Sequence, residues 1–245
     1  MVLAYFYGLL DSLLLLYIRW GLWGMGEPTI AFKPMSNRRR TVLLSPVAVL
    51  VLGNAVARIS GHLWGVWWWI PVILVSWITL ALIMAFAGGW SEYRRWLQAS
   101  HGAWGWRLLS FAPTALFIPV FLLNFRSLNQ PWVISSWLAV AIIDPWLEEG
   151  YWRGLLIDSA SGWPGWLIVT YTTFWFGLSH PLLLGVNVKA MSGFPGFLGT
   201  VFTGAIWSTV YFRTHSLRWP FLSHFIADLL SVSVIVFLNR AILAR

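Results

Sequence analysis

The sequence predicts an all-α integral-membrane protein, a bundle of about eight transmembrane helices. Composition is the first reason: of 245 residues, 59% are hydrophobic and 10% are charged, whereas a soluble domain carries about 25% charged residues. Secondly, runs of about 20 apolar residues recur, and a helix of that length crosses a hydrocarbon core of about 30 Å. Thirdly, these runs are continuous and do not alternate, which argues against a transmembrane β-barrel.

Eight segments are expected to cross the membrane, in a single domain without an internal repeat. Residues 1–131 hold the N-terminal spans, and residues 132–240 hold a core that is richer in polar side chains. The N-terminus lacks a basic start and a small-residue cleavage site, so the first span is interpreted as a retained helix. In chain order the expected spans are 2–20, 42–57, 63–87, 108–124, 132–157, 165–184, 196–212 and 219–239.

The basic residues predict the orientation in the membrane. The loops 24–41, 88–107 and 213–218 fall on one side of an eight-span chain and, with Arg19 at its edge, carry ten basic residues against five on the other side. By the positive-inside rule, both termini then face away from the cytoplasm. The net charge of +8 is therefore assigned to membrane-surface loops that contact lipid, and not to nucleic-acid binding. With no sign of a eukaryotic targeting signal, a prokaryotic plasma membrane is expected.

Ionisable residues within the spans are the candidate functional residues, because such groups are costly in a bilayer and mark function by default. They gather in the last half of the chain, apart from Asp11 in the first span, which is interpreted as structural or interfacial. The chain has no cysteine, which excludes disulfides and a thiolate nucleophile. The group comprises Asp144, Glu148, Glu149, Arg153, Asp158, His180, His224 and Asp228.

Helical spacing separates the two adjacent glutamates. Glu149 and Arg153 are four residues apart and are expected to form an ion pair on one face of the helix. Glu148 points about 100° away and shares its face with Asp144, so its carboxyl is free to act as a general base. Pro145 between them is expected to kink the helix.

The two histidines have different surroundings. His180 follows Phe176 by four residues on one helical face, and Pro181 is expected to push it out of the helical conformation, to a break or a helix end. His224 and Asp228 form a second i,i+4 pair, in which the carboxyl orients the imidazole or holds a proton opposite it.

Three motifs in this order resemble one family. "EEGYWR", with Glu148, Glu149 and Arg153, fits EExxxR. "FGLSH", with Phe176 and His180, fits FxxxH, and "HFIAD", with His224 and Asp228, fits HxxxN/D. Together they resemble the CAAX protease and bacteriocin-processing family of intramembrane proteases, which is related to the type II CAAX prenyl endopeptidase. The resemblance covers about residues 132–240.

The resemblance implies a helical membrane fold with a polar intramembrane cavity and an endopeptidase of the glutamic type. Glu148 would be the general base and His180 its partner in activating a water. His224 and Asp228 would stabilise the oxyanion. The structural support of the site would come from Glu149, Arg153 and Phe176. Family members often have Asn at the last position, where an amide N–H can donate to an oxyanion. Asp228 is therefore either protonated in this low-dielectric site, or it orients His224 and leaves the donor role to that imidazole.

Several alternatives remain open at this stage. No cofactor is expected, but zinc held by Glu148, His180 and His224 would make the protein a metalloprotease. A serine protease would use Ser179 with His224 as base, although the Gly-x-Ser-Gly form is absent. A non-catalytic membrane immunity or scaffold protein, or a proton-coupled transporter, is the alternative outside enzymes. The expected substrate is a membrane-associated protein or peptide, and the oligomeric state is left open.

Overall fold

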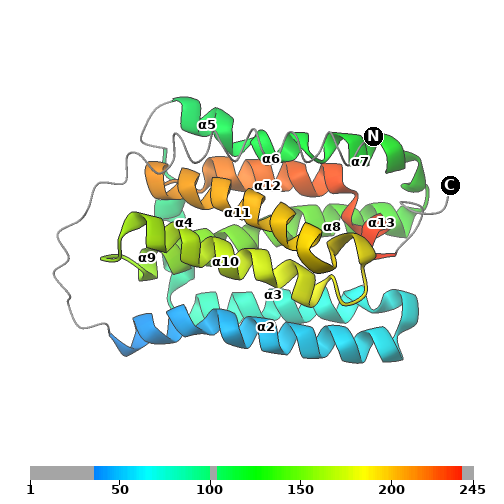
Figure 1. The fold of residues 1–245 in the computed structure, drawn as a ribbon, viewed down its shortest axis with the longest axis horizontal. Helices are drawn as coiled ribbons and strands as arrows, with labels where there is room; N and C mark the ends of the chain where they lie inside the picture. Colours follow the sequence, from blue (N-terminus) through cyan, green and yellow to red (C-terminus); the bar gives the residue numbers. More distant parts are fainter. Residues whose placement is uncertain (1–35, 100–103, 239–245) are drawn as a thin grey trace.

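The computed structural model describes residues 36–99 and 104–238, which are helical and contain no β-strand (Figure 1). The all-α prediction is confirmed. The expected span 2–20, with Asp11, lies outside the described residues. In chain order the α-helices are α2 (Asn37–Leu63), α3 (Trp69–Phe86), α4 (Gly89–Trp96), α5 (Trp104–Ser110), α6 (Ala112–Ala115), α7 (Ile118–Asn124), α8 (Pro131–Glu148), α9 (Leu156–Ser159), α10 (Gly165–Leu183), α11 (Gly193–Thr214), α12 (Arg218–Ser231) and α13 (Ser233–Phe237). Residues Glu149–Leu155 form a π-helix between α8 and α9, and short 3₁₀ turns occupy Gly65–Trp67, Phe125–Ser127 and Lys189–Met191.

Three helical stretches of the described residues are long and apolar enough to cross a membrane. They are Asn37–Leu63, Gly65–Phe86 and Trp104–Ser127. The outer surfaces of α2 and α3 are apolar as well: Leu44 is 68% exposed and Phe86 is 81% exposed. An extended apolar surface of this kind is unusual for a soluble monomer and suits contact with acyl chains.

The long helices lie lengthwise beside one another (Figure 1). Helices α2 and α3 form one edge, α5 to α7 form the opposite edge, and α8, α10, α11 and α12 lie between them. The start of α2, α4, α9 and the start of α12 share one end of the bundle. Helix α11 packs closely on α10 because Gly204 has no side chain: a Cβ there would lie 2.7 Å from the Phe176 ring.

Helix α8 continues through Pro145 and changes its hydrogen bonding at Glu149. The Leu156 amide donates to the Tyr151 carbonyl, five residues back, as in a π-helix. Gly150 and Gly154 lie inside this segment, and glycine weakens the preference for a regular α-helix. The irregular backbone therefore begins at the second glutamate, four residues after the expected kink.

The prediction that Pro181 takes His180 out of the helical conformation is wrong, whereas the expected position near a helix end is confirmed. Helix α10 runs through both residues to Leu183, which puts His180 in its last turn. A proline cannot donate to the carbonyl four residues back, here that of Gly177. The Thr200 hydroxyl of α11 donates to that carbonyl at 2.9 Å instead. A side chain from a neighbouring helix thus replaces the missing donor and lets the helix continue.

Candidate active site

A buried ion pair lies at the start of the π-helix. Arg153 Nη1 donates to Glu149 Oε1 at 2.9 Å, and the two side chains are 0% and 1% exposed. The guanidinium carbon lies 4.0 Å from the centre of the Phe176 ring and 5.2 Å from that of Trp207. Two aromatic faces and one carboxylate therefore surround this cation, an arrangement that stabilises a desolvated arginine. The ion pair expected from the i,i+4 spacing is confirmed.

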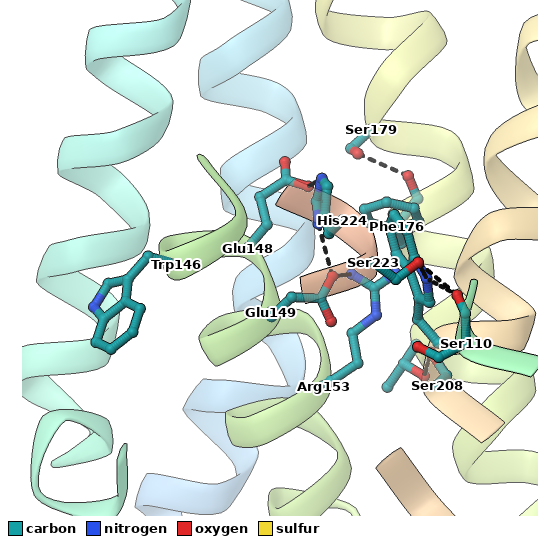
Figure 2. Close-up of polar contacts among 12 residues, drawn as sticks. Ser110, Trp146, Glu148, Glu149, Arg153, Phe176, Ser179, Ser208, Ser223 and His224 are labelled. Atoms are coloured by element: carbon teal, nitrogen blue, oxygen red, sulfur yellow. Dashed lines mark hydrogen bonds and ion pairs between the residues drawn. The ribbon is translucent and has the colours of Figure 1, made fainter. Parts of the chain in front are cut away.

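Glu149 also binds His224, a contact that the sequence did not predict. Its Oε1 lies 2.8 Å from His224 Nδ1, so one carboxylate oxygen joins the π-helix to α12 (Figure 2). The imidazole stacks on Trp207 of α11, with ring centres 4.4 Å apart and planes inclined by 24°. The Trp207 indole is itself fixed, because its N–H donates to the Ser110 carbonyl and to the Ser223 hydroxyl. His224 is consequently held in one orientation.

That orientation turns His224 Nε2 toward Glu148 and Asp228. The distances from Nε2 are 4.0 Å to Glu148 Oε2 and 3.7 Å to Asp228 Oδ2, which are too long for hydrogen bonds. Both oxygens are buried and have no hydrogen-bond partner in the described part of the chain. Buried carboxylate oxygens are normally paired, so the three atoms form a polar centre suited to a small bridging ligand such as water. The expected i,i+4 proximity of His224 and Asp228 is present.

Asp144 belongs to the same group. One ligand atom each of Asp144, Glu148 and His224 can be chosen so that all lie within 4.8 Å of one another. The Trp77 indole of α3 donates to Asp144 Oδ1 at 2.7 Å. The sequence placed Asp144 on the face of Glu148 but gave it no role. The signal that identifies it is this same i,i+4 spacing.

His180 lies on the other side of Phe176. Its Nδ1 is 3.2 Å from the Phe176 carbonyl, and its ring centre is 4.8 Å from that of Phe176, which in turn is 6.5 Å from the His224 ring. An Nδ1–H that donates to this carbonyl leaves Nε2 as an acceptor. Among residues 36–99 and 104–238, no hydrogen bond or ion pair joins His180 to Glu148. Activation of one water by both side chains therefore stays a prediction.

Residues 130–230 match the family model described as "Type II CAAX prenyl endopeptidase Rce1-like". Residues 130–230 are thus similar to an Rce1-like domain. This match confirms the resemblance expected from the three motifs. It covers α8, the π-helix, α10 and α11 and extends into α12, which together supply the candidate site residues. Comparisons with curated proteins and with solved structures give no match.

The Rce1-like match and the three long apolar helices both indicate an integral-membrane protein. The Rce1-like match also supports a CAAX-type intramembrane protease in general terms. The roles of single residues, the metal content and the polar cavity stay predictions. Two pockets among the described residues lie away from this group: one of about 260 Å³ borders Gly61, Trp68 and Asn187, and one of about 230 Å³ borders Thr41, Ser45 and Phe86.

Ser179, within the matched region, makes its contacts inside its own helix. Its hydroxyl donates to the Phe176 carbonyl at 2.7 Å, and it lies 3.1 Å from His180 Nδ1. The serine-protease alternative pairs Ser179 with His224, and no described hydrogen bond joins these two. The contacts of this hydroxyl therefore favour a structural role.

Asp158, also within the matched region, lies outside the site. It accepts hydrogen bonds from Arg95 Nη2 at 2.5 Å, from the Trp96 indole at 2.8 Å and from the Tyr211 hydroxyl at 3.0 Å. This carboxylate thus joins α9 to α4 and α11 at the end of the bundle.

Proposed function

We propose that this protein is an intramembrane endopeptidase of the glutamic type, which hydrolyses a peptide bond in a membrane-associated protein or peptide. The observation that carries the proposal is the position of His224. Glu149 holds one of its nitrogens, and the other faces the unpaired oxygens of Glu148 and Asp228. The Rce1-like match supports the protease class.

In the proposed reaction, Glu148 takes a proton from a water as the water oxygen attacks the scissile carbonyl carbon. The carbonyl π-electrons move to its oxygen, and the resulting oxyanion accepts a hydrogen bond from Nε2 of a protonated His224. Glu149 stabilises that imidazolium through Nδ1–H, as a carboxylate does in a catalytic triad. The proton on Glu148 then passes to the amide nitrogen as the C–N bond breaks, which gives a carboxylate and an amine.

His180 and Asp228 have supporting roles in this proposal. His180 Nε2, left as an acceptor by the hydrogen bond at Nδ1, is suited to orient the attacking water together with Glu148. Asp228 lies beside the donor nitrogen of His224 and helps to orient that nitrogen toward the oxyanion. Arg153 balances Glu149, and Phe176 separates the two imidazoles.

The test measures hydrolysis of a dye-labelled farnesylated peptide that ends in a CAAX sequence, by the full chain in lipid nanodiscs, with mass spectrometry to locate the cut. We expect Glu148→Gln to lower kcat by about 100-fold or more, the range for loss of a general base. Lys189→Gln is the control, because Lys189 is an exposed charged side chain in the turn between α10 and α11. A Glu148→Gln variant that cleaves the peptide at the wild-type rate would overturn the glutamic mechanism. A scaffold or immunity protein would show no cleavage and would keep its cellular phenotype in this variant.

A zinc-dependent protease is the second candidate, and the grouping of Asp144, Glu148 and His224 favours it. Two carboxylates and an imidazole are ligand types that zinc accepts, and the unpaired oxygen of Glu148 fits such a role. The ligand set differs from the predicted one, since Asp144 takes the place of His180. Zinc bound there would supply Lewis-acid polarisation of a carbonyl or a water. Activity lost to a chelator and restored by zinc alone would select this candidate over the metal-free one.

We further propose a prokaryotic plasma membrane as the location. A prenylated C-terminus, a peptide leader and a C-terminal anchor are the substrate classes to compare in the same assay.

A further inference from the structure

Helix α4 is an amphipathic surface helix that packs against the π-helix. Its Tyr93 and Trp96 are buried, while Arg94 and Arg95 are exposed. The segment lies at the shared end of the bundle, beside α9 (Figure 1). The Rce1-like match begins at residue 130, so α4 is outside it.

The two glycines of the π-helix receive these two aromatic side chains. A Cβ at Gly150 would collide with the Tyr93 hydroxyl, and a Cβ at Gly154 would lie 2.7 Å from the Trp96 ring. Gly150 directly follows Glu149, and Gly154 directly follows Arg153. The side chains of α4 thus contact the π-helix backbone directly after Glu149 and directly after Arg153, the two members of the buried ion pair.

Tyr93 also makes a directed contact with the turn that carries the glutamates. Its hydroxyl donates to the Trp146 carbonyl, and its ring stacks on the Trp146 ring with centres 4.8 Å apart and planes inclined by 2°. The Trp146 carbonyl also accepts the Glu149 amide at the passage from α8 to the π-helix. A carbonyl oxygen has two lone pairs and can accept both hydrogen bonds. Tyr93 therefore adds a second restraint on the backbone where α8 passes into the π-helix.

Helix α4 is itself anchored to the elements around the site. Asp158 binds Arg95 and Trp96, and the Leu217 amide donates to the Trp96 carbonyl at 2.8 Å, just before α12. Burial acts to lower the pKa of Arg95, but the Asp158 and Glu92 carboxylates outweigh it, and the pKa lies above its ordinary value. Arg95 therefore stays charged over the working pH range. Helix α4 thus connects the π-helix, which carries Glu149, with the start of α12, which carries His224.

We propose that Tyr93 is a positioning residue, which orients Glu148 and Glu149 through its hydrogen bond to the Trp146 carbonyl. This inference rests on the proposed function. It adds to the site a residue from outside the family match, 53 positions from its partner in sequence.

Tyr93→Phe tests the inference, because it keeps the ring and removes the hydroxyl. Tyr171→Phe is the matched control: the Tyr171 hydroxyl also donates to a backbone carbonyl, that of Leu43, but it joins α10 to α2. In the farnesyl-peptide assay we expect Tyr93→Phe to lower kcat about tenfold, since small misplacements of reacting groups cost up to about 100-fold, with KM within about twofold. We expect Tyr171→Phe to stay within about twofold of wild type. Equal effects of the two variants would overturn the inference.

A second measurement does not depend on protease activity. The chain has no cysteine, so Glu148→Cys introduces a single thiol, whose rate of reaction with a small maleimide reports the position of residue 148. We expect that rate to change by about threefold or more when Tyr93→Phe is added, and to be unchanged when Tyr171→Phe is added. Both measurements use the monodisperse, folded fraction. An unchanged rate in both backgrounds would refute positioning by Tyr93, whereas activity that survives Glu148→Gln would refute only the proposed function.

Discussion

At the scale of single residues, two adjacent glutamates have opposite environments. Glu149 shares one oxygen between Arg153 and His224 and is 1% exposed. Glu148 has an unpaired buried oxygen and lies near Asp144 and Asp228. The Glu149 carboxylate is needed as the counter-charge of Arg153, whereas Glu148 is one of several carboxyl groups that lie close together.

The same substitution at the two positions should therefore have different effects on stability. We expect Glu149→Gln to lower the free energy of unfolding by about 3–5 kcal/mol, because it leaves Arg153 as a buried charge without its partner. Glu148→Gln should leave stability unchanged or raise it, because it removes one of several close carboxyls. Thermal unfolding in detergent, read beside peptide hydrolysis, measures both. A Glu149→Gln variant as stable as Glu148→Gln would contradict the assigned counter-charge.

The sequence alone was sufficient for part of this arrangement. The i,i+4 spacing located the Glu149–Arg153 pair and put Asp144 on the face of Glu148. It could not show that Glu149 reaches His224, or that Trp207 stacks on that imidazole, because these contacts join different helices and depend on how α11 and α12 pack. Local spacing determines which side chains share a helix face, whereas tertiary packing determines what that face meets.

At the scale of helices, the close approach of α10 and α11 positions Phe176. The Phe176 ring contacts Arg153, His180 and His224, and Gly204 leaves the space that the ring occupies.

We expect Gly204→Ala to destabilise the protein by about 1–3 kcal/mol through overpacking and to lower activity by displacing the Phe176 ring. Gly199→Ala on the same helix is the control, because a Cβ there meets nothing within 4 Å; it should be neutral or stabilising by up to about 1 kcal/mol. Thermal melts and hydrolysis rates of both variants check this. Equal melting temperatures would mean that the ring moves aside without cost.

The continuation of α10 through Pro181 is a second property of this helix pair. Sequence rules predicted a disturbed helical conformation at His180, because they consider only the segment that contains the proline. The hydroxyl that accounts for the intact helix comes from Thr200, 23 residues after Gly177.

We expect Thr200→Val to destabilise the protein by about 1–3 kcal/mol, the cost of an unsatisfied buried carbonyl, and to increase fraying around His180. Thr203→Val is the control, because the Thr203 hydroxyl donates only within α11, to the Gly199 carbonyl. Hydrogen exchange of the last turn of α10, measured by mass spectrometry, checks the expectation. Faster exchange in Thr203→Val than in Thr200→Val would contradict it.

At the scale of the whole molecule, the described basic side chains divide unequally between the two ends of the bundle. Arg38 to Arg40, Arg94 and Arg218 lie at the end shared by the start of α2, α4 and the start of α12. The orientation predicted by the positive-inside rule puts this end in the cytoplasm.

Single cysteines test this orientation in intact cells. We expect an impermeant maleimide to label Ala190→Cys, in the turn between α10 and α11, and to label Ser91→Cys on α4 only after the cells are opened. The absence of native cysteine makes each signal unambiguous. Labelling of Ser91→Cys alone in intact cells would mean that the bundle is inverted.

Trp146 gives the site an outer boundary. Its side chain is 37% exposed on the apolar flank, yet it stacks on Tyr93 and makes an edge contact with Phe221, one turn before His224. This partly exposed indole thus joins α8 to α4 and α12 at the surface of the bundle. Of these three rings Trp146 is the most exposed, so a hydrophobic molecule that approaches from the bilayer would meet it before Tyr93.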